Sequence, residues 1–421
     1  MRARPLLAVA FALAAGWTAL GLLVEAGGRQ LGTATPPFVA GWRPEADLVW
    51  SVLAALALAA VVAAGPALLA LRRGFPLAVF AAALGVALAV NAARIGTHGW
   101  SAIFDDSFEA KNEYLPGLPA LSYGARFFLD RFAELVPSLP VNVAGHPPGL
   151  MLFLDATGLT TPGRLAALCI AAAAAVPPLA WWLARGVGGE ERARMAAVLA
   201  LLSPCLLLYG ATSADAVYAA LGTAAAALLV RPSLAARAAG TVVLAVGAFC
   251  SWALLAAGAF AVVVVWRREG LRAAAVLAVA CAIPFLALNA VLAAAYGYDP
   301  IGALQATEDY YRRSLAEIRP WWYWSVGSPV AWAVTTGLPI AGAWLVAVRR
   351  ADPVALGLAA IVVVASVLGF TKAETERIWL PWVPLACVAA ASVLPPRHLR
   401  AALTALAVQA LATQLLFETV W

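Results

Sequence analysis

Charge is scarce in this chain of 421 residues: 12% of the residues are charged, and lysine occurs only as Lys111 and Lys372. The sequence has no basic stripe with interleaved aromatic residues, which argues against a nucleic-acid-binding surface despite a formal net charge of +6. It also lacks ten-residue segments of alternating hydrophobicity, which argues against a membrane β-barrel. We find no internal repeat.

Cysteine and histidine are also few, with five and three residues. No pair of cysteines has CxxC spacing, and all five lie inside or at the edge of apolar runs. We therefore interpret them as small core residues rather than as disulfides or metal ligands. The cysteines are Cys169, Cys205, Cys250, Cys281 and Cys387.

Apolar residues dominate instead: they make up 64% of the chain, and the mean hydropathy is +0.87. Runs of about 17–25 apolar residues recur, each long enough to cross a bilayer as a helix. We therefore predict an all-α, polytopic integral membrane protein with about 11–13 transmembrane helices. The expected spans are 5–25, 47–71, 76–96, 162–185, 191–209, 212–231, 234–249, 251–267, 271–296, 328–348, 354–371, 378–395 and 400–419, with the break in 234–267 near Ser251.

The arginines set the expected orientation, because compact clusters between spans favour the cytoplasmic side. With the amino terminus inside and the carboxy terminus outside, every such cluster is cytoplasmic. These clusters are Arg2/Arg4, Arg72–Arg73, Arg185/Arg192/Arg194, Arg231/Arg237, Arg267–Arg268/Arg272, Arg349–Arg350 and Arg397/Arg400. We expect one integral membrane domain over 1–421, with no separate soluble domain. It comprises the spans of 1–96, an outer loop at 97–147, core spans in 148–296, a second outer loop at 297–327 and the spans of 328–421.

Two segments next to the first outer loop carry helical patterns. Residues 120–136 place apolar side chains at helical spacing opposite charged ones, which predicts an amphipathic helix on the outer leaflet. Pro147–Pro148 open a short apolar stretch, GLMLFLDATGL, that is too short to cross. We expect an interfacial or re-entrant helix there.

The densest polar segment is SAIFDDSFEAKNEYLPGL, residues 101–118. Its carboxylates Asp105 and Asp106 follow a span closely, so they suit general-base chemistry or cation binding at the membrane surface. The alternative is an ordinary solvated loop. Lys111 and Lys372 both lie on the predicted outer side, where a cation could hold a phosphate.

Other candidate residues also cluster on the predicted outer face. His146 is either a binding or a structural residue. Asp215 begins an otherwise uncharged helix, where an acid also complements the helix dipole. Interfacial tryptophans surround Tyr310, Arg312 and Arg313, which could bind an anionic headgroup. The segment TKAETER holds Lys372, Glu374, Glu376 and Arg377, as an ion-paired hinge or a phosphate clamp.

In this order, the acidic pair, HPPG, LLSPCLLLYGATSADAVYAAL and ERIWLPWVPL resemble the GT-C superfamily of membrane glycosyltransferases, over roughly 97–395. The similarity is greatest to protein O-mannosyltransferases and lipid A aminoarabinose transferases. Many such relatives have a carboxy-terminal soluble domain, which we do not expect in this chain.

This resemblance implies roles for particular residues. Asp105 takes the position of the catalytic base and Asp106 that of its companion, with Glu113 as a rival base. His146 matches the proline motif, and Asp215 matches the acid after the SP…Y helix. The resemblance implies substrate contacts from these two residues, and the arginines and lysines would hold a lipid phosphate.

The expected reaction is inverting transfer of a sugar from a polyprenyl-phosphate donor to a hydroxyl acceptor at the outer face of a bacterial plasma membrane. The acceptor would be a glycan, a glycolipid or a protein. Asp105, Asp106 and His146 could converge on a divalent metal, but a lipid-phosphate leaving group does not require one, and we expect none. The alternatives are a transporter or lipid flippase, which would place charges mid-membrane on broken helices, and a non-catalytic scaffold with the same fold.

Overall fold

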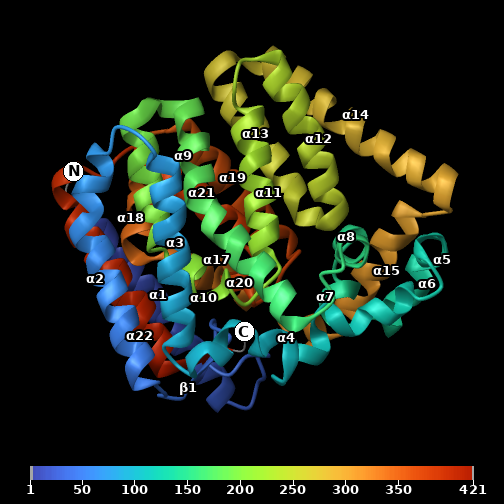
Figure 1. The fold of residues 1–421 in the computed structure, drawn as a ribbon, viewed down its shortest axis with the longest axis horizontal. Helices are drawn as coiled ribbons and strands as arrows, with labels where there is room; N and C mark the ends of the chain where they lie inside the picture. Colours follow the sequence, from blue (N-terminus) through green and yellow to red (C-terminus); the bar gives the residue numbers. More distant parts are fainter. Residues whose placement is uncertain (1–2, 420–421) are drawn as a thin grey trace.

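The computed structural model describes residues 3–419, and these residues form an almost entirely helical protein (Figure 1). Five helices are long and apolar enough to cross a membrane, or six spans if one bent helix pair is counted as one. Five shorter apolar helices have 10–17 residues. The predicted all-α polytopic membrane class is therefore confirmed. We expected about 11–13 spans, which is more than the five or six helices that are long enough to cross a membrane, because the five shorter apolar helices are counted separately.

The elements follow one another along the chain with short connections. The first part contains α1 (Ala3–Ala26), β1 (Ala40–Trp42), α2 (Leu48–Ala70), α3 (Phe75–Ala92), η1 (Gly96–Trp100), α4 (Ala102–Asp105), η2 (Ala110–Asn112), η3 (Leu115–Leu121), α5 (Ala125–Asp130), α6 (Phe132–Leu135), η4 (Val136–Ser138), α7 (Val141–Ala144), α8 (Gly149–Thr157), α9 (Pro162–Leu201), α10 (Pro204–Tyr209) and α11 (Asp215–Leu229). The second part contains α12 (Leu234–Cys250), η5 (Trp252–Leu254), α13 (Leu255–Glu269), α14 (Leu271–Tyr296), α15 (Pro300–Arg312), α16 (Leu315–Ile318), α17 (Trp321–Thr336), α18 (Leu338–Arg349), α19 (Pro353–Leu368), α20 (Thr375–Ile378), η6 (Leu380–Trp382), α21 (Val383–Ala391), η7 (Pro396–His398), α22 (Leu399–Leu416) and β2 (Phe417–Thr419).

Most predicted spans coincide with helices. The span expected at 271–296 is α14, with the same bounds, and the break expected near Ser251 separates α12 from α13. The span expected at 162–185 and most of the span expected at 191–209 form one long helix, α9, and the rest of the second span is the short helix α10. α9 is kinked at Gly189, whose φ of 82° is outside the helical region.

The span expected at 328–348 is not a single straight helix. It consists of α17 and α18, whose axes differ by 116°. The chain turns at Gly337, which has a φ of 118° and would place a Cβ atom 2.2 Å from Leu406 Cδ2. Only glycine fits this turn, and hydropathy, which reports composition and not direction, did not reveal it.

The amphipathic helix expected at 120–136 is also interrupted. α5 and α6 are separated by Arg131, which has a φ of −104° and a ψ of 7°. The apolar side chains still face inward: Phe128 and Phe132 are fully buried in a small core between the loop and the ends of the membrane helices. The short helix expected after Pro148 is α8.

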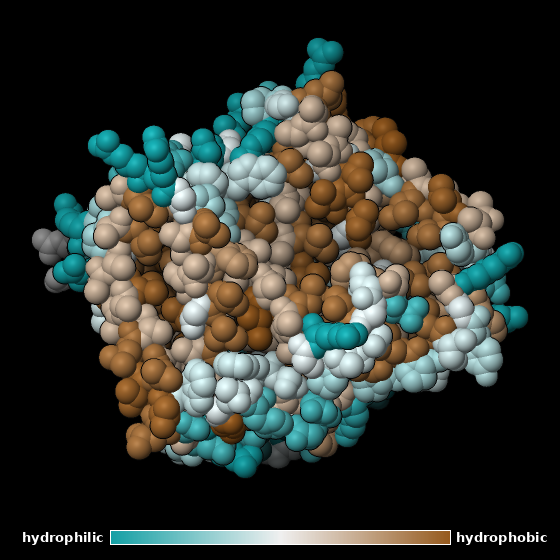
Figure 2. Space-filling view, viewed as in Figure 1, coloured by the Kyte–Doolittle hydropathy of each residue, from teal (hydrophilic) through white to brown (hydrophobic). Residues whose placement is uncertain are grey.

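The arginine-rich turns lie together at one end of the bundle. Arg194 donates to the carbonyls of Leu69 and Leu71, and Arg268 donates to the carbonyl of Gly186. Arg2 lies outside the described residues. Figure 2 shows hydrophilic side chains along the upper and lower edges of the molecule, with apolar side chains between them.

A two-stranded sheet was not predicted. β1 pairs antiparallel with β2, with Ala40 opposite Thr419 and Trp42 opposite Phe417. The pairing ties the loop after α1 to the end of α22. Three-residue strands give too little alternation to be recognised in a sequence.

Candidate functional site

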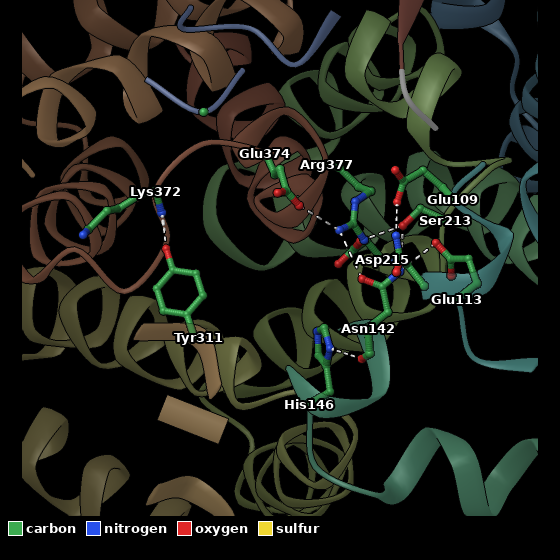
Figure 3. Close-up of polar contacts among 12 residues, drawn as sticks. Glu109, Glu113, Asn142, His146, Ser213, Asp215, Tyr311, Lys372, Glu374 and Arg377 are labelled. Carbon is green, nitrogen blue, oxygen red and sulfur yellow. Dashed lines mark hydrogen bonds and ion pairs between the residues drawn. The ribbon is translucent and has the colours of Figure 1, made fainter. Parts of the chain in front are cut away.

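Four segments from distant parts of the sequence meet at the start of α11, and the arginine-rich turns lie at its other end, where Arg231 contacts the Trp182 carbonyl. Figure 3 shows the polar contacts among these segments. They are the loop after η2, the helix α7, the start of α11 and the helix α20. Each brings one or more polar side chains into a buried cluster. We call this set, which is formed by Glu113, Asn142, Asp215, Glu374 and Arg377, the buried polar cluster.

Arg377 lies at the centre of the buried polar cluster and is 5% exposed. Its Nη1 atom is 2.8 Å from Asp215 Oδ2, and its Nη2 atom is 3.4 Å from both Asn142 Oδ1 and Glu374 Oε2. Burial opposes its charge, but the surrounding carboxylates outweigh that effect and raise the pKa of Arg377. The guanidinium is therefore a fixed, fully desolvated cation.

Asp215 is the first residue of α11 and is 3% exposed. Besides Arg377, its Oδ2 atom accepts a hydrogen bond of 2.6 Å from Ser213 Oγ, which in turn accepts from the Asp215 backbone N–H. Asp215 begins a helix, where the dipole favours negative charge, and its carboxylate faces Arg377 and not the exposed pair Asp105 and Asp106.

Glu113 occupies the opposite side of the cluster, with 1% exposure. Asn142 Nδ2 donates a hydrogen bond of 2.7 Å to Glu113 Oε1. Burial raises the pKa of Glu113 to about 8, and the negative charges of Asp215 and Glu109 add to that effect, against the opposing charge of Arg377. This carboxyl group therefore exchanges a proton near physiological pH.

Asn142 joins the two halves of the cluster, because its amide contacts both Glu113 and Arg377. The backbone carbonyl oxygen of Asn142 lies 2.7 Å from His146 Nδ1. A carbonyl only accepts hydrogen bonds, so Nδ1 of His146 carries the proton and Nε2 is free to accept. Asn142 carries no charge and lies in no recognisable motif, so its place four residues before His146 was the only available signal.

His146 is held between two tyrosines. Its ring stacks on Tyr218 with centroids 5.2 Å apart, and the hydroxyls of Tyr218 and Tyr114 are 2.6 Å apart. Burial lowers the pKa of His146. The imidazole is therefore neutral at pH 7, and it positions Asn142 rather than supplying charge.

A second group of polar contacts holds the loop at 371–377. Arg319 pairs with Glu374 at 2.8 Å and donates to the Lys372 carbonyl. The Lys372 backbone N–H donates to the Tyr311 hydroxyl, and its Nζ atom donates to the Ala316 carbonyl. Burial together with the charges of Arg312 and Arg319 lowers the pKa of Lys372.

The loop at 371–377 also has an unusual backbone. Ala373 and Glu374 have φ angles of 64° and 58°, in the left-handed region that residues with a Cβ atom rarely adopt. The contacts of Glu374 to Arg319 and Arg377 hold this conformation.

The predicted acidic pair lies outside the buried polar cluster. Asp105 and Asp106 are exposed at the end of α4, and Asp106 Oδ1 is 3.1 Å from His98 Nε2. Lys111 is also exposed, and its Nζ atom lies 4.0 Å from the centre of the Phe108 ring. These residues form the outer surface of the loop that buries Glu113.

Tyr310, Arg312 and Arg313, which were predicted to bind an anionic headgroup, also lie outside the buried polar cluster. Arg312 and Arg313 form ion pairs with Glu308 and Asp309, one helical turn away, and their side chains are 70% and 81% exposed. Tyr310 packs at the edge of the loop core. Such exposed pairs contribute little stability.

Glu376 points away from the cluster that its neighbour Arg377 forms. It is 1% exposed, and its Oε1 atom accepts a hydrogen bond of 2.8 Å from the Val39 backbone N–H. Among the described residues, its Oε2 atom has no partner. Glu376 therefore attaches the loop before β1 to α20.

Replacing Glu376 with glutamine is expected to weaken the pH dependence of folding. Burial raises the pKa of Glu376 to about 7, so the folded chain keeps a proton that an unfolded glutamate releases above its pKa of ~4.3. Stability therefore falls as pH rises through this window, by up to ~1.4 kcal/mol per pH unit. Melting temperatures of the detergent-solubilised protein between about pH 5 and 8 measure the slope. A slope equal to that of the exposed control Glu308→Gln would contradict this account.

No group of three or more histidine, cysteine, aspartate and glutamate side chains within residues 3–419 is arranged to hold a metal ion. In particular, Asp105 and Asp106 do not meet His146, since the aspartates are exposed and His146 contacts Asn142.

Comparisons with known proteins give a distant structural likeness. No family model matches the chain, and no curated protein matches it. A crystal structure of ArnT from Cupriavidus metallidurans bound to undecaprenyl phosphate aligns with a TM-score of 0.49 and 16% sequence identity. The alignment covers 78% of this chain and 62% of the ArnT chain.

Proposed function

We propose that this protein is a membrane glycosyltransferase that moves a sugar from a polyprenyl phosphate to an acceptor hydroxyl. The observation that carries the proposal is the pairing of Glu113 with Arg377 through Asn142: a carboxyl group that can take a proton and a fixed cation sit in one buried cluster. The resemblance of the ordered motifs to the GT-C superfamily supports the same reaction.

The proposed reaction is a single displacement. The acceptor oxygen attacks the anomeric carbon while its proton passes to a carboxylate, and the bond from that carbon to the phosphate oxygen breaks. The configuration inverts, and the lipid phosphate leaves with the bonding electrons. Arg377 would stabilise the charge that develops on the phosphate in this low-dielectric site, and Lys372 and Arg319 would bind it nearby.

We assign the role of the base to Glu113. Asp105 has the position that the resemblance implies, but it is exposed to water, whereas Asn142 links Glu113 to the cation that would face the leaving group. In this proposal Asp105, Asp106 and Lys111 border the entrance. His146 fixes Asn142, and Asp215 fixes Arg377. Glu376, Tyr310, Arg312 and Arg313 support the surrounding loops.

The proposal also includes an orientation. The arginine-rich turns would face the cytoplasm and the buried polar cluster the outer side of a bacterial plasma membrane, within one integral membrane domain. The donor, the acceptor and the surrounding lipids would be the partners of the chain, and no cofactor enters the reaction. Envelope glycan or glycolipid synthesis is the corresponding role.

The direct test is sugar transfer by the purified protein in nanodiscs. We expect radiolabelled sugar to pass from mannosyl- or aminoarabinosyl-undecaprenyl phosphate to a glycan or glycolipid acceptor. A donor panel is needed because the sugar is not defined by the cluster. Failure of all such donors, together with uptake of a labelled solute or lipid by vesicles that contain the protein, would replace this proposal with transport.

One observation favours the second candidate, a transporter or flippase. The pair α17 and α18 is bent by 116° and can be interpreted as a broken span, a feature of many transporters. Glu113, which exchanges a proton near neutral pH, would then couple transport to protons. Against this, the buried charges gather at one end of the bundle and not on the two arms of the bend.

The pH dependence of transfer is expected to identify the base. If Glu113 accepts the proton, kcat/KM should rise about tenfold per pH unit and level off above about pH 8, because this quantity reports the pKa of the free enzyme. Initial rates at limiting acceptor concentration between about pH 6 and 9 measure the profile. A flat profile over that range would contradict the role of Glu113.

A further inference from the structure

A second polar site lies outside the buried polar cluster. It is a pocket of about 210 Å³ between the end of α1 and the segment that leads into α17. Five side chains determine its chemistry: Arg29, Gln30, Glu317, Pro320 and Trp322. Aliphatic side chains complete the wall. We call it the Trp322 pocket.

The polar side chains of the Trp322 pocket are uncommitted. Arg29, Gln30 and Glu317 are all exposed, and within residues 3–419 their side chains form no hydrogen bond or ion pair with another residue. The Trp322 ring is 42% exposed and contacts Tyr323 edge to face. Together they leave one flat apolar surface and three free polar groups around one small space.

These groups fit a sugar ring. Arginine only donates hydrogen bonds, glutamate only accepts them, and glutamine does both, so the three together match hydroxyls, which donate and accept. The opposite charges of Arg29 and Glu317 balance, which disfavours a phosphate or another strongly charged ligand. The volume is below the ~300 Å³ typical of the smallest drug-sized sites, as suits a single ring stacked by its C–H face on an indole.

The Trp322 pocket shares a rigid frame with the buried polar cluster. The carbonyl of Leu31, in its wall, accepts a hydrogen bond of 3.1 Å from Trp324 Nε1, and the next carbonyl, of Gly32, accepts from Arg319. Arg319 pairs with Glu374, which in turn contacts Arg377. One continuous set of hydrogen bonds and ion pairs thus joins the two sites.

We infer that the Trp322 pocket binds a sugar ring of the acceptor, which makes the acceptor a glycan or a glycolipid headgroup. Only the identification of the bound sugar as the acceptor rests on the proposed function. The binding of a neutral sugar ring is inferred from the side chains of the pocket. The transferred sugar would then be added to a chain that is held at a second point beside the reacting hydroxyl.

Direct binding tests the pocket without any transfer. We expect methyl α-D-mannopyranoside or methyl β-D-glucopyranoside to show saturation-transfer NMR signals with the protein in nanodiscs. Trp322→Ala should weaken binding about tenfold, through loss of the stacking surface. The control is Trp321→Ala, because Trp321 is also half exposed but donates its indole N–H to the Val367 carbonyl outside the pocket.

The outcomes separate the two proposals. Equal binding by Trp322→Ala and Trp321→Ala, or displacement of the glycoside by millimolar inorganic phosphate, would overturn the sugar pocket. With octyl α-D-mannopyranoside as acceptor, Trp322→Ala should raise the acceptor KM about tenfold and leave kcat nearly unchanged. An unchanged KM with active transfer would overturn the acceptor role, whereas selective glycoside binding without transfer from any donor would overturn the proposed function and leave the pocket established.

Discussion

Glu113→Gln should lower the rate of sugar transfer by a factor of about 10²–10⁴, which is the usual contribution of a general base. Glutamine keeps an oxygen for the hydrogen bond from Asn142, so the local structure should survive. Donor binding should also survive, because the base contacts the acceptor and not the phosphate. Single-turnover transfer and donor binding, measured on the same preparation, check both statements.

The informative controls are Asp105→Asn and Asp106→Asn. Both aspartates are exposed, so we expect each substitution to change the rate by less than about tenfold. Near-normal transfer by Glu113→Gln, with a collapse of activity in Asp105→Asn, would return the base to the acidic pair that the sequence resemblance indicates. Glu113 would then have only a structural role.

Arg377→Gln should affect both folding and activity. It leaves Asp215 and Glu374 without their shared buried cation, and breaking a buried ion pair in this way costs about 3–5 kcal/mol. Donor binding should be lost as well, because the cation is proposed to hold the lipid phosphate. Thermal unfolding and a donor-binding assay in detergent measure the two effects.

The double variant Asp215→Asn/Arg377→Gln separates these effects. Removing both charges of the closest pair should restore a large part of the stability, because an uncompensated carboxylate no longer remains. Transfer and donor binding should stay absent. If the double variant recovers donor binding, Arg377 is structural and the phosphate is held elsewhere, with Lys372 as the first candidate.

The membrane helices were predictable from the sequence because burial in lipid requires continuous apolar runs. α14 is the clearest case: its apolar run lies between Gly270 and Gly297, and both residues have positive φ angles that end a helix. The direction of a helix was not predictable in the same way. At Gly337 a Cβ atom would meet Leu406 from a distant helix, and no local pattern records that contact.

The candidate site was only partly predictable, for a related reason. His146, Glu113, Asp215 and Arg377 were all candidates, and the structure brings them together from four segments. The density of charge along the chain pointed to Asp105 and Asp106, but linear density does not distinguish a buried acid from an exposed one. Asn142 and Tyr218 could not be identified, because uncharged side chains gain meaning here only from their partners.

The left-handed backbone at Ala373 and Glu374 has a consequence for ligand recognition. Such conformations cost about 1–3 kcal/mol each, and that cost is met once, when the chain folds. In return, the Arg377 side chain is immobile before any ligand arrives. Ordering a free arginine at the moment of association would cost about 0.5–1.5 kcal/mol of conformational entropy. The Arg377 side chain is therefore preorganised for an anion, and it loses little conformational entropy when the anion binds.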